Sequence, residues 1–117
     1  FIPDKWYAFA VTQSNYEDLM DVGVSIYQYT PGFNHGKTFV VDDEYAVVGT
    51  INLDFRSLYL HFECGVWMYN TESVGQVKES ILEALKISRQ VRMEDIKKTA
   101  RFKKIARTVL RIFAPLM

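Results

Sequence analysis

The sequence is poor in metal-binding and disulfide-forming residues, and it has no long apolar run. Its single cysteine, Cys64, excludes an internal disulfide and a cysteine-based zinc cluster. We therefore expect a metal-free, cofactor-free site in a reducing compartment, with Cys64 as a buried, inert thiol. No apolar stretch reaches the roughly 18 residues that cross a bilayer, and no signal peptide opens the chain. Because the chain also starts without methionine, we expect a fragment whose parent carries any membrane-spanning segment outside these residues.

The formal charge of zero hides an asymmetry along the chain. The 117 residues are 49% hydrophobic, which is typical of one small globular domain rather than a disordered tail. Residues 1–94 carry 13 acids and 7 bases, whereas residues 95–117 carry 1 acid and 7 bases. The body is therefore at −6 and the tail at +6, so we expect an anionic partner to meet the tail.

Helix and strand signals alternate, which predicts an α/β fold. The spacing predicts helix over residues 6–20, with a capping box at Ser14–Glu17 that starts a second helix or bends one, and a C-cap at Gly23. Further on, the pattern predicts four strands and one helix: strands at 24–29, 34–41, 45–49 and 63–69, a short loop or helical turn at 52–59, and a helix from 70–71 to about Arg89.

From Glu94 onward, apolar and basic residues separate onto two faces of a predicted helix. The apolar face holds Phe102, Ile105, Ala106, Val109, Leu110 and Phe113. The basic face holds Lys97, Lys98, Arg101, Lys104, Arg107 and Arg111. We divide the chain into a domain at 1–92 and a basic amphipathic helix at 93–117. We expect this helix to lie on an anionic membrane, with docking onto the domain or a partner as the alternative.

The stretch 35–42 concentrates groups suited to phosphodiester chemistry. His35 and Lys37 stand two apart on a predicted strand, so both side chains should point the same way. An imidazole can act as nucleophile, base or acid near neutral pH. Lys37 and Asn52 would hold the phosphoryl oxygens, with Thr50 adding a hydroxyl. This set predicts a site for an anion and a nucleophile.

The spacing His35-x-Lys37-x4-Asp42 resembles the HxKxxxxD signature of the phospholipase D superfamily. The continuation Gly49-Thr50-x-Asn52-x-Asp54-x-Arg56-Ser57, with Phe62-Glu63 beyond it, looks most like the C-terminal half of a bacterial cardiolipin synthase. The resemblance implies a phospholipase D-like half-domain, in which a mixed sheet is flanked by helices. Weaker likeness covers nearly the whole chain.

The resemblance also implies roles for the acidic residues. Glu63 matches the downstream acid that orients a catalytic histidine, typically that of the opposite half; the alternative is a surface charge at a strand edge. Asp42 is expected to be structural, away from the phosphate. Asp54 and Arg56 are interpreted as a pair that fixes the loop, and Ser57 completes the supporting set. At position 61 the family often has Asn, and we interpret His61 as a surface substitution rather than a second site group.

Enzymes of this superfamily carry two such motifs, and this sequence holds one. We therefore expect the chain to be half of a longer enzyme, or a protomer that pairs with a second copy. The leading hypothesis is phosphatidyl transfer between two phosphatidylglycerol molecules at the cytoplasmic side of a bacterial membrane. The alternatives are a homodimeric phospholipase D-like nuclease or phosphodiesterase and a non-catalytic membrane-binding module. The apolar stripe of the tail suits a bilayer better than a duplex, so no nucleic acid is expected.

Overall fold

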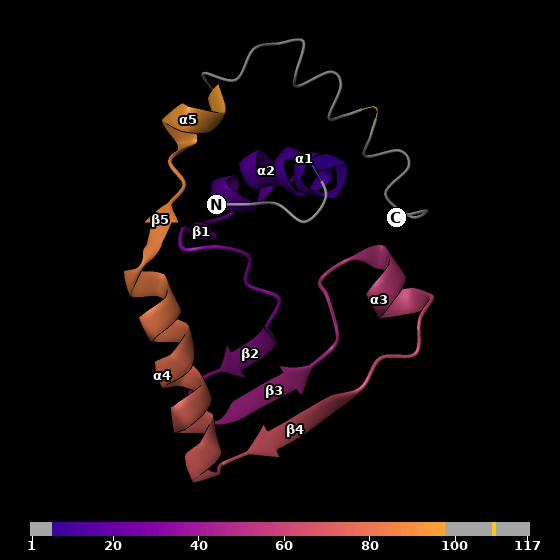
Figure 1. Cartoon of the computed structure of the whole chain (residues 1–117), viewed down its shortest axis with the longest axis vertical. Coiled ribbons are helices and arrows are strands. Elements are labelled where there is room, and N and C mark those ends of the chain that lie inside the picture. The colour runs from indigo at the N-terminus through magenta and orange to yellow at the C-terminus, as the bar shows by residue number, and fades with distance from the viewer. Residues whose placement is uncertain (1–5, 98–108, 110–117) are drawn as a thin grey trace. The chain divides into compact units, whose positions relative to one another are not determined.

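The computed structural model describes residues 6–97 and 109, and these form two compact units. One unit comprises the chain up to Phe33 together with the stretch from Ser88, and the other comprises residues 34–87 (Figure 1). The first unit contains α1 (Trp6–Ser14), α2 (Tyr16–Asp21), β1 (Tyr27–Tyr29), β5 (Ser88–Gln90) and α5 (Met93–Lys97). The second contains β2 (Lys37–Val41), β3 (Tyr45–Gly49), α3 (Phe55–Tyr59), β4 (Gly65–Tyr69) and α4 (Glu72–Lys86). The predicted α/β class is confirmed.

The first unit is built around an antiparallel pair of short strands. Tyr27 of β1 lies opposite Gln90 of β5, and the Val91 N–H donates to the Ile26 carbonyl to extend the pairing. Val91 is buried with Tyr16 and Ile96, which brings α2, β5 and α5 onto one small core. Burial of these side chains holds together segments that lie 75 to 80 residues apart in sequence.

The break between α1 and α2 differs from the predicted capping box. Ser14 stays in the last turn of α1, where its hydroxyl donates to the Val11 carbonyl at 2.6 Å. Asn15 is the N-cap of α2, and its side chain makes no capping bond. The predicted box is therefore wrong, because the Ser14 hydroxyl bonds backwards within its own helix.

Gly23 ends α2 as predicted. Its φ is +92°, a conformation that costs glycine little. The Gly23 N–H donates to the Met20 carbonyl and the Val24 N–H to the Leu19 carbonyl, each at 3.0 Å. These two bonds form a Schellman motif, so the predicted C-cap is confirmed.

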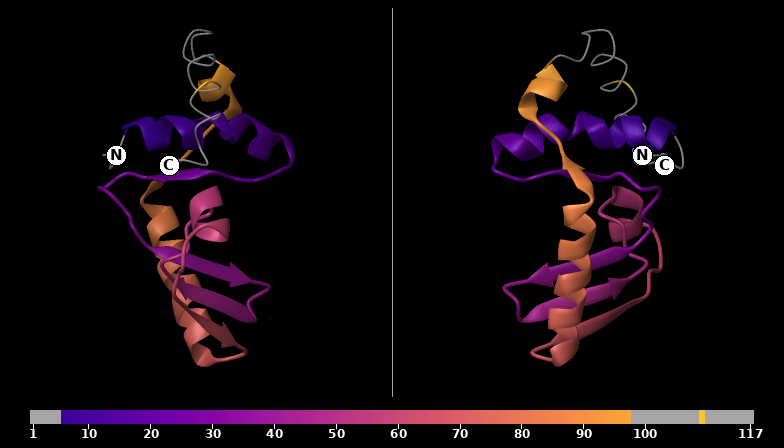
Figure 2. Two further views of the ribbon diagram at one scale, coloured as in Figure 1. Left: turned by 90° about the vertical axis from the view of Figure 1, so that its right-hand side faces the viewer. Right: turned by 60° about the vertical axis from the view of Figure 1, so that its left-hand side comes forward.

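The second unit is a three-stranded antiparallel sheet in the order β2-β3-β4. Helix α4 lies across one face of the sheet, as Figure 2 shows, and contacts all three strands. Ala46 of β3 and Val74 of α4 are the most buried residues of this layer, at 1% and 2% exposed. The predicted hairpin of 34–41 with 45–49 is present, and Tyr45 stacks across the strands on Tyr69 at 4.7 Å between ring centroids.

Some predicted boundaries shift. The motif strand begins at Lys37 rather than at 34, and the strand predicted at 24–29 covers Tyr27–Tyr29 alone. The long helix ends at Lys86, because Ser88–Gln90 pairs with β1 instead of continuing it. Cys64 is exposed, so its prediction as a buried thiol is wrong; it precedes β4 and engages Thr50 through its backbone.

The predicted basic amphipathic helix falls mostly outside the described residues. Within them, α5 covers Met93–Lys97, and Val109 is helical and half exposed. The division into residues 1–92 and 93–117 stays a prediction. In the described part of the chain, no helix is long and apolar enough to cross a membrane.

Candidate active site

The strand register gathers the predicted site residues at one end of the three-stranded sheet. Lys37 begins β2 and lies opposite Gly49, the last residue of β3, and Gly49 lies opposite Gly65, the first residue of β4. The segments that flank this end therefore leave or enter the sheet side by side. They hold His35, Thr50, Asn52 and Glu63.

The pairing of β3 and β4 at this end requires a glycine. A Cβ atom on Gly49 would lie 2.6 Å from the Gly65 Cα and closer still to the Cys64 carbonyl oxygen. Both are backbone atoms and cannot rotate away. Gly49 thus lets the two strands close up where the site segments begin.

His35 and Lys37 meet by a different route from the one predicted. His35 lies in the irregular segment before β2, so the alternation of side chains along a strand does not place it. Instead, the Lys37 Nζ donates to the His35 carbonyl at 2.7 Å. The Asn34 side chain accepts from the Gly36 N–H at 2.9 Å and shapes the same segment. The ammonium is thereby held beside the residue that carries the imidazole.

Glu63 is tied to Thr50 across the β3–β4 junction. The Thr50 hydroxyl donates to Glu63 Oε2 at 2.5 Å and accepts from the Cys64 N–H at 3.0 Å. The Thr50 N–H also donates to the Cys64 carbonyl at 2.9 Å. The hydrogen bond from Thr50, followed by one from Ser57, lowers the pKa of Glu63 below its usual value. The carboxylate is therefore held ionised, with the Thr50 hydroxyl as its closest donor.

Helix α3 ties the supporting residues together. Asp54 is its N-cap, and its Oδ1 accepts from the Ser57 N–H at 2.7 Å. Ser57 is buried, and its hydroxyl lies 3.4 Å from the Asn52 Nδ2 and bonds Glu63. Ser57 thus connects the Asn52 amide to the Glu63 carboxylate, a role that the sequence pattern did not assign to it.

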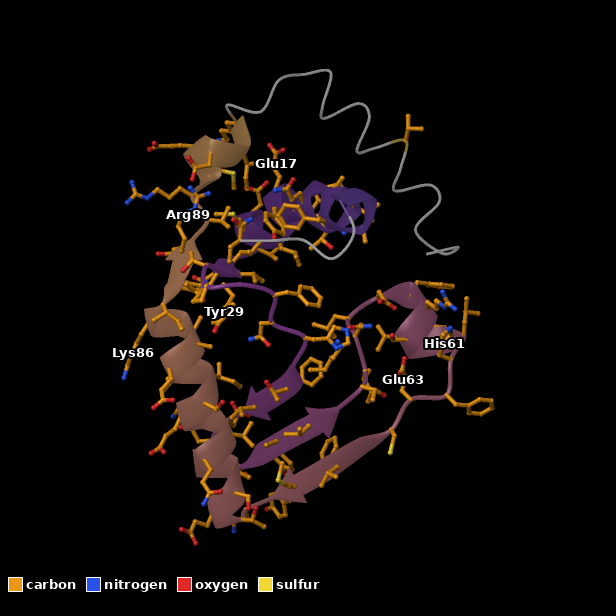
Figure 3. The ribbon with its side chains drawn as sticks, viewed as in Figure 1. Glu17, Tyr29, His61, Glu63, Lys86 and Arg89 are labelled. Carbon is orange, nitrogen blue, oxygen red and sulfur yellow. The ribbon has the colours of Figure 1, made fainter. Side chains whose placement is uncertain are left out.

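Arg56 and His61 form a contact that was not predicted. The Arg56 Nε–H donates to His61 Nε2, and the His61 N–H donates to the Arg56 carbonyl at 3.0 Å. Figure 3 places His61 with Glu63 near α3. The spacing of five residues across a helix end is the signal that could have revealed this pair.

Asp42 lies at the opposite end of β2 from Lys37. It is exposed in the hairpin turn, where Asp42 and Asp43 have φ values of +52° and +61°. The neighbouring Asp43 pairs with Lys78 of α4 at 2.6 Å. Asp42 therefore lies in the turn, at the end of the hairpin remote from Lys37, and its structural role stays a prediction.

The arrangement suits an anionic phosphoryl group. An imidazole-bearing residue, an ammonium, an amide and an oriented carboxylate lie on segments that meet at one sheet end. Among residues 6–97, no group of three His, Cys, Asp or Glu side chains is placed to hold a metal ion. The hairpin that follows His35 and the acid ahead of β4 match the phospholipase D-like half-domain that the sequence resemblance implies.

Comparison with known proteins gives the family. A family model described as "Cardiolipin synthase, PLD-like domain" matches residues 2–85, and the chain belongs to this family. An uncharacterized protein of Streptococcus mutans is 47% identical over 99% of the chain and 25% of its own length. Cardiolipin synthase of Halalkalibacterium halodurans is 35% identical over 98% of the chain and 23% of its own length. Cardiolipin synthase 2 of Bacillus anthracis is 33% identical over 98% of the chain and 22% of its own length.

The chain therefore spans about a quarter of the length of these relatives. No solved structure matches it.

Proposed function

We propose that the chain is the C-terminal catalytic part of a phospholipase D-type phosphatidyltransferase that makes cardiolipin from two molecules of phosphatidylglycerol. The observation that carries this proposal is the register of β2, β3 and β4, which gathers His35, Lys37, Asn52 and Glu63 at one sheet end. The family match and relatives named cardiolipin synthase support the substrate class.

The proposed reaction has two displacements at phosphorus. In the first, one imidazole attacks, a P–N bond forms, and the P–O bond to glycerol breaks while a second imidazole protonates the departing oxygen. In the second, the terminal hydroxyl of another phosphatidylglycerol gives its proton to that second imidazole and attacks phosphorus. The P–N bond breaks, and cardiolipin leaves. His35 is one of the two imidazoles.

Lys37 and Asn52 are proposed to stabilise the phosphoryl oxygens as their charge rises in the transition state. Lys37 supplies a point charge, and its contact with the His35 carbonyl keeps it near that residue. Asn52 supplies amide N–H groups beside Ser57. Glu63 is proposed to fix the tautomer of a catalytic imidazole, and its ionised state suits that role.

The second imidazole is proposed to come from another HxKxxxxD half, either in the same polypeptide or in a second copy of this chain. We also propose that the enzyme works at the cytoplasmic face of a bacterial cell membrane. There the basic residues of 95–117 would meet anionic lipids.

Substitution of His35 tests the proposal. We expect His35→Ala to abolish cardiolipin formation in the active enzyme, because either imidazole role is indispensable to the exchange. Lys37→Ala should lower the rate by about 10²–10³, as expected for loss of one transition-state donor. The matched control is Lys78→Ala, which removes a lysine at the turn end of the sheet and should leave the rate nearly unchanged.

The assay follows conversion of labelled phosphatidylglycerol to cardiolipin and glycerol, with single-stranded and duplex DNA as competing substrates. Substantial cardiolipin formation by the His35 variant contradicts the mechanism. Cleavage of DNA in place of lipid transfer would replace the proposed function with a nuclease.

A further inference from the structure

The segment between Asn52 and Glu63 exposes an unusual share of large apolar side chains. We call residues 53–62 the apolar loop; it contains α3. Its exposed apolar residues are Leu53, Phe55, Leu58, Tyr59, Leu60 and Phe62. Leu53 is 79% exposed, Tyr59 73%, and Phe62 fully so. Six of the ten residues are thus large, apolar and exposed, and such a concentration of exposed apolar side chains marks an interaction surface.

The fold of the apolar loop does not depend on burying these side chains. Its helical turn is held by internal backbone bonds: the Leu58 N–H donates to the Asp54 carbonyl, and the Leu60 N–H to the Arg56 carbonyl, both at about 3 Å. Ser57, the buried residue of α3, anchors the loop to the site through Asn52 and Glu63. The loop is thus preformed, with its apolar side chains turned to the outside.

The charges of the apolar loop point to the kind of surface that it meets. Its one acid, Asp54, is committed to the N-cap of α3. Glu63, just beyond the loop, is bonded by Thr50. Arg56 is exposed among the apolar side chains, in contact with His61. A cation amid exposed aliphatic and aromatic residues complements a layer that combines anionic headgroups with acyl chains.

The aromatic residues of the loop fit the same surface. Phe55 and Tyr59 lie one helical turn apart, with ring centroids 5.0 Å from each other. Tyrosine has an apolar ring and a polar tip, and it is favoured where one side is apolar and the other wet.

We propose that the apolar loop is a membrane-docking element, in which residues 53–62 enter the headgroup and upper acyl region of an anionic phospholipid surface. The inference rests on the proposed function, because it assigns the loop to the lipid on which that function acts. Asn52 and Glu63 flank the loop in sequence, on either side of residues 53–62. Docking of the loop therefore brings lipid phosphates to the sheet end that holds His35 and Lys37. The loop thereby selects lipid at a surface over dispersed phosphodiesters.

The test places an environment-sensitive fluorophore at position 62. In a Cys64→Ser background, Phe62→Cys is labelled and mixed with vesicles of pure phosphatidylglycerol or pure phosphatidylcholine. We expect a blue shift and a several-fold rise in emission with phosphatidylglycerol, and a much smaller change with phosphatidylcholine. The matched control is Leu82→Cys, an exposed apolar site on α4 of the same unit, whose emission should change little.

A second variant asks whether the loop is needed for binding. Leu53→Asp with Tyr59→Asp should reduce sedimentation with phosphatidylglycerol vesicles at least tenfold, while circular dichroism and the melting temperature stay near those of the parent. The paired control, Val22→Asp with Leu82→Asp, changes two exposed apolar residues outside the loop and should bind as the parent does.

Unchanged emission at position 62 with phosphatidylglycerol overturns the inference. An emission change in the absence of lipid also overturns it, if the change accompanies a doubling of the molecular mass in solution. The loop would then contact a second copy of the chain. Membrane binding and cardiolipin synthesis are measured separately. If the His35→Ala variant still binds phosphatidylglycerol vesicles but the parent chain makes no cardiolipin, the proposed function fails and the membrane-docking proposal stands.

Discussion

At the scale of the residue, Glu63 shows how one hydroxyl sets the state of a carboxylate. The Thr50 hydroxyl donates to Glu63 Oε2, and this bond is the largest cause of the lowered pKa. A lowered folded-state pKa means that the bond stabilises the fold above the pKa of the unfolded chain. That contribution disappears as the pH falls through the lower, folded-state pKa. The pH dependence of stability that Glu63 causes therefore lies on the acidic side of the usual pKa range of glutamate.

Thr50→Val should raise the pKa of Glu63, because valine keeps the shape of threonine but cannot donate to the carboxylate. Carbon-detected NMR titration of the Glu63 side chain measures the shift. Ser57→Ala should raise the same pKa by less, since Ser57 is the second cause. The matched control, Thr38→Val, removes an exposed hydroxyl on β2 and should leave the Glu63 titration in place. An unchanged titration in Thr50→Val would refute the assigned contact.

The identities of the candidate site residues could be predicted from the sequence, but the hydrogen bonds among them could not. Motif spacing selected His35, Lys37, Asn52 and Glu63 because such chemistry needs an imidazole, donors and an orienting acid. The bond between Thr50 and Glu63 was not predictable, because it joins residues 13 apart through the register of β3 and β4. Prediction of His35 on the strand was wrong because β2 begins at Lys37, and the Gly36 N–H ahead of it donates to the Asn34 side chain instead of to a strand partner.

At the scale of the element, the sheet end tolerates no side chain at Gly49. Gly49→Ala should lower the free energy of unfolding by about 1–3 kcal/mol, because the added methyl meets backbone that must move. The control is Gly75→Ala in α4, where nothing lies within 4 Å of the new Cβ. There alanine should stabilise by about 0.5–1 kcal/mol through its higher helix propensity.

Urea denaturation measures the free energy of unfolding of both glycine variants, and the two changes should have opposite signs. A Gly49→Ala variant as stable as the parent would mean that β3 and β4 do not approach as described. Equal losses in both variants would point to a general cost of replacing glycine rather than to a close backbone contact.

The elements that could be predicted carry local signals. The hairpin followed from β-branched runs on both sides of Asp42-Asp43-Glu44, and α4 from the apolar spacing of Val74, Val77, Ile81 and Leu85. β5 could not be predicted, because Ser88-Arg89-Gln90 lacks strand-forming residues and becomes a strand through pairing with β1. Tertiary pairing decides such short strands.

At the scale of the whole molecule, the single motif limits what one copy can do. We expect the purified monomeric chain to make no cardiolipin, because one imidazole cannot be bonded to phosphorus and also protonate the departing glycerol. Turnover should be measured together with mass in solution. Robust turnover by a strictly monomeric sample would disprove the half-site arrangement, whereas turnover confined to a dimer would show that a second copy supplies the missing half.

The tail, residues 95–117, should add membrane affinity separate from that of the apolar loop. Each Lys or Arg near an anionic surface contributes about 1 kcal/mol, so removal of residues 98–117, which spares the buried Ile96 of α5, should weaken binding to phosphatidylglycerol vesicles strongly at low salt. Vesicle flotation of the chain with and without residues 98–117 measures the difference in binding, and raised salt should narrow it. Equal flotation of both would show that the tail takes no part in membrane binding.

The position of the β2–β3 turn has a consequence for chain-length variation. Lys37 and Gly49 lie at one end of the sheet, and Asp42 and Asp43 form the turn at the other. Residues added at the turn therefore lengthen the hairpin without displacing the end that holds Lys37. Exposed turns accept such insertions at a small entropic cost. Homologous chains should therefore vary in length at 43–44, after the motif aspartate, and a peptide tag grafted there would leave His35, Lys37 and their partners in place.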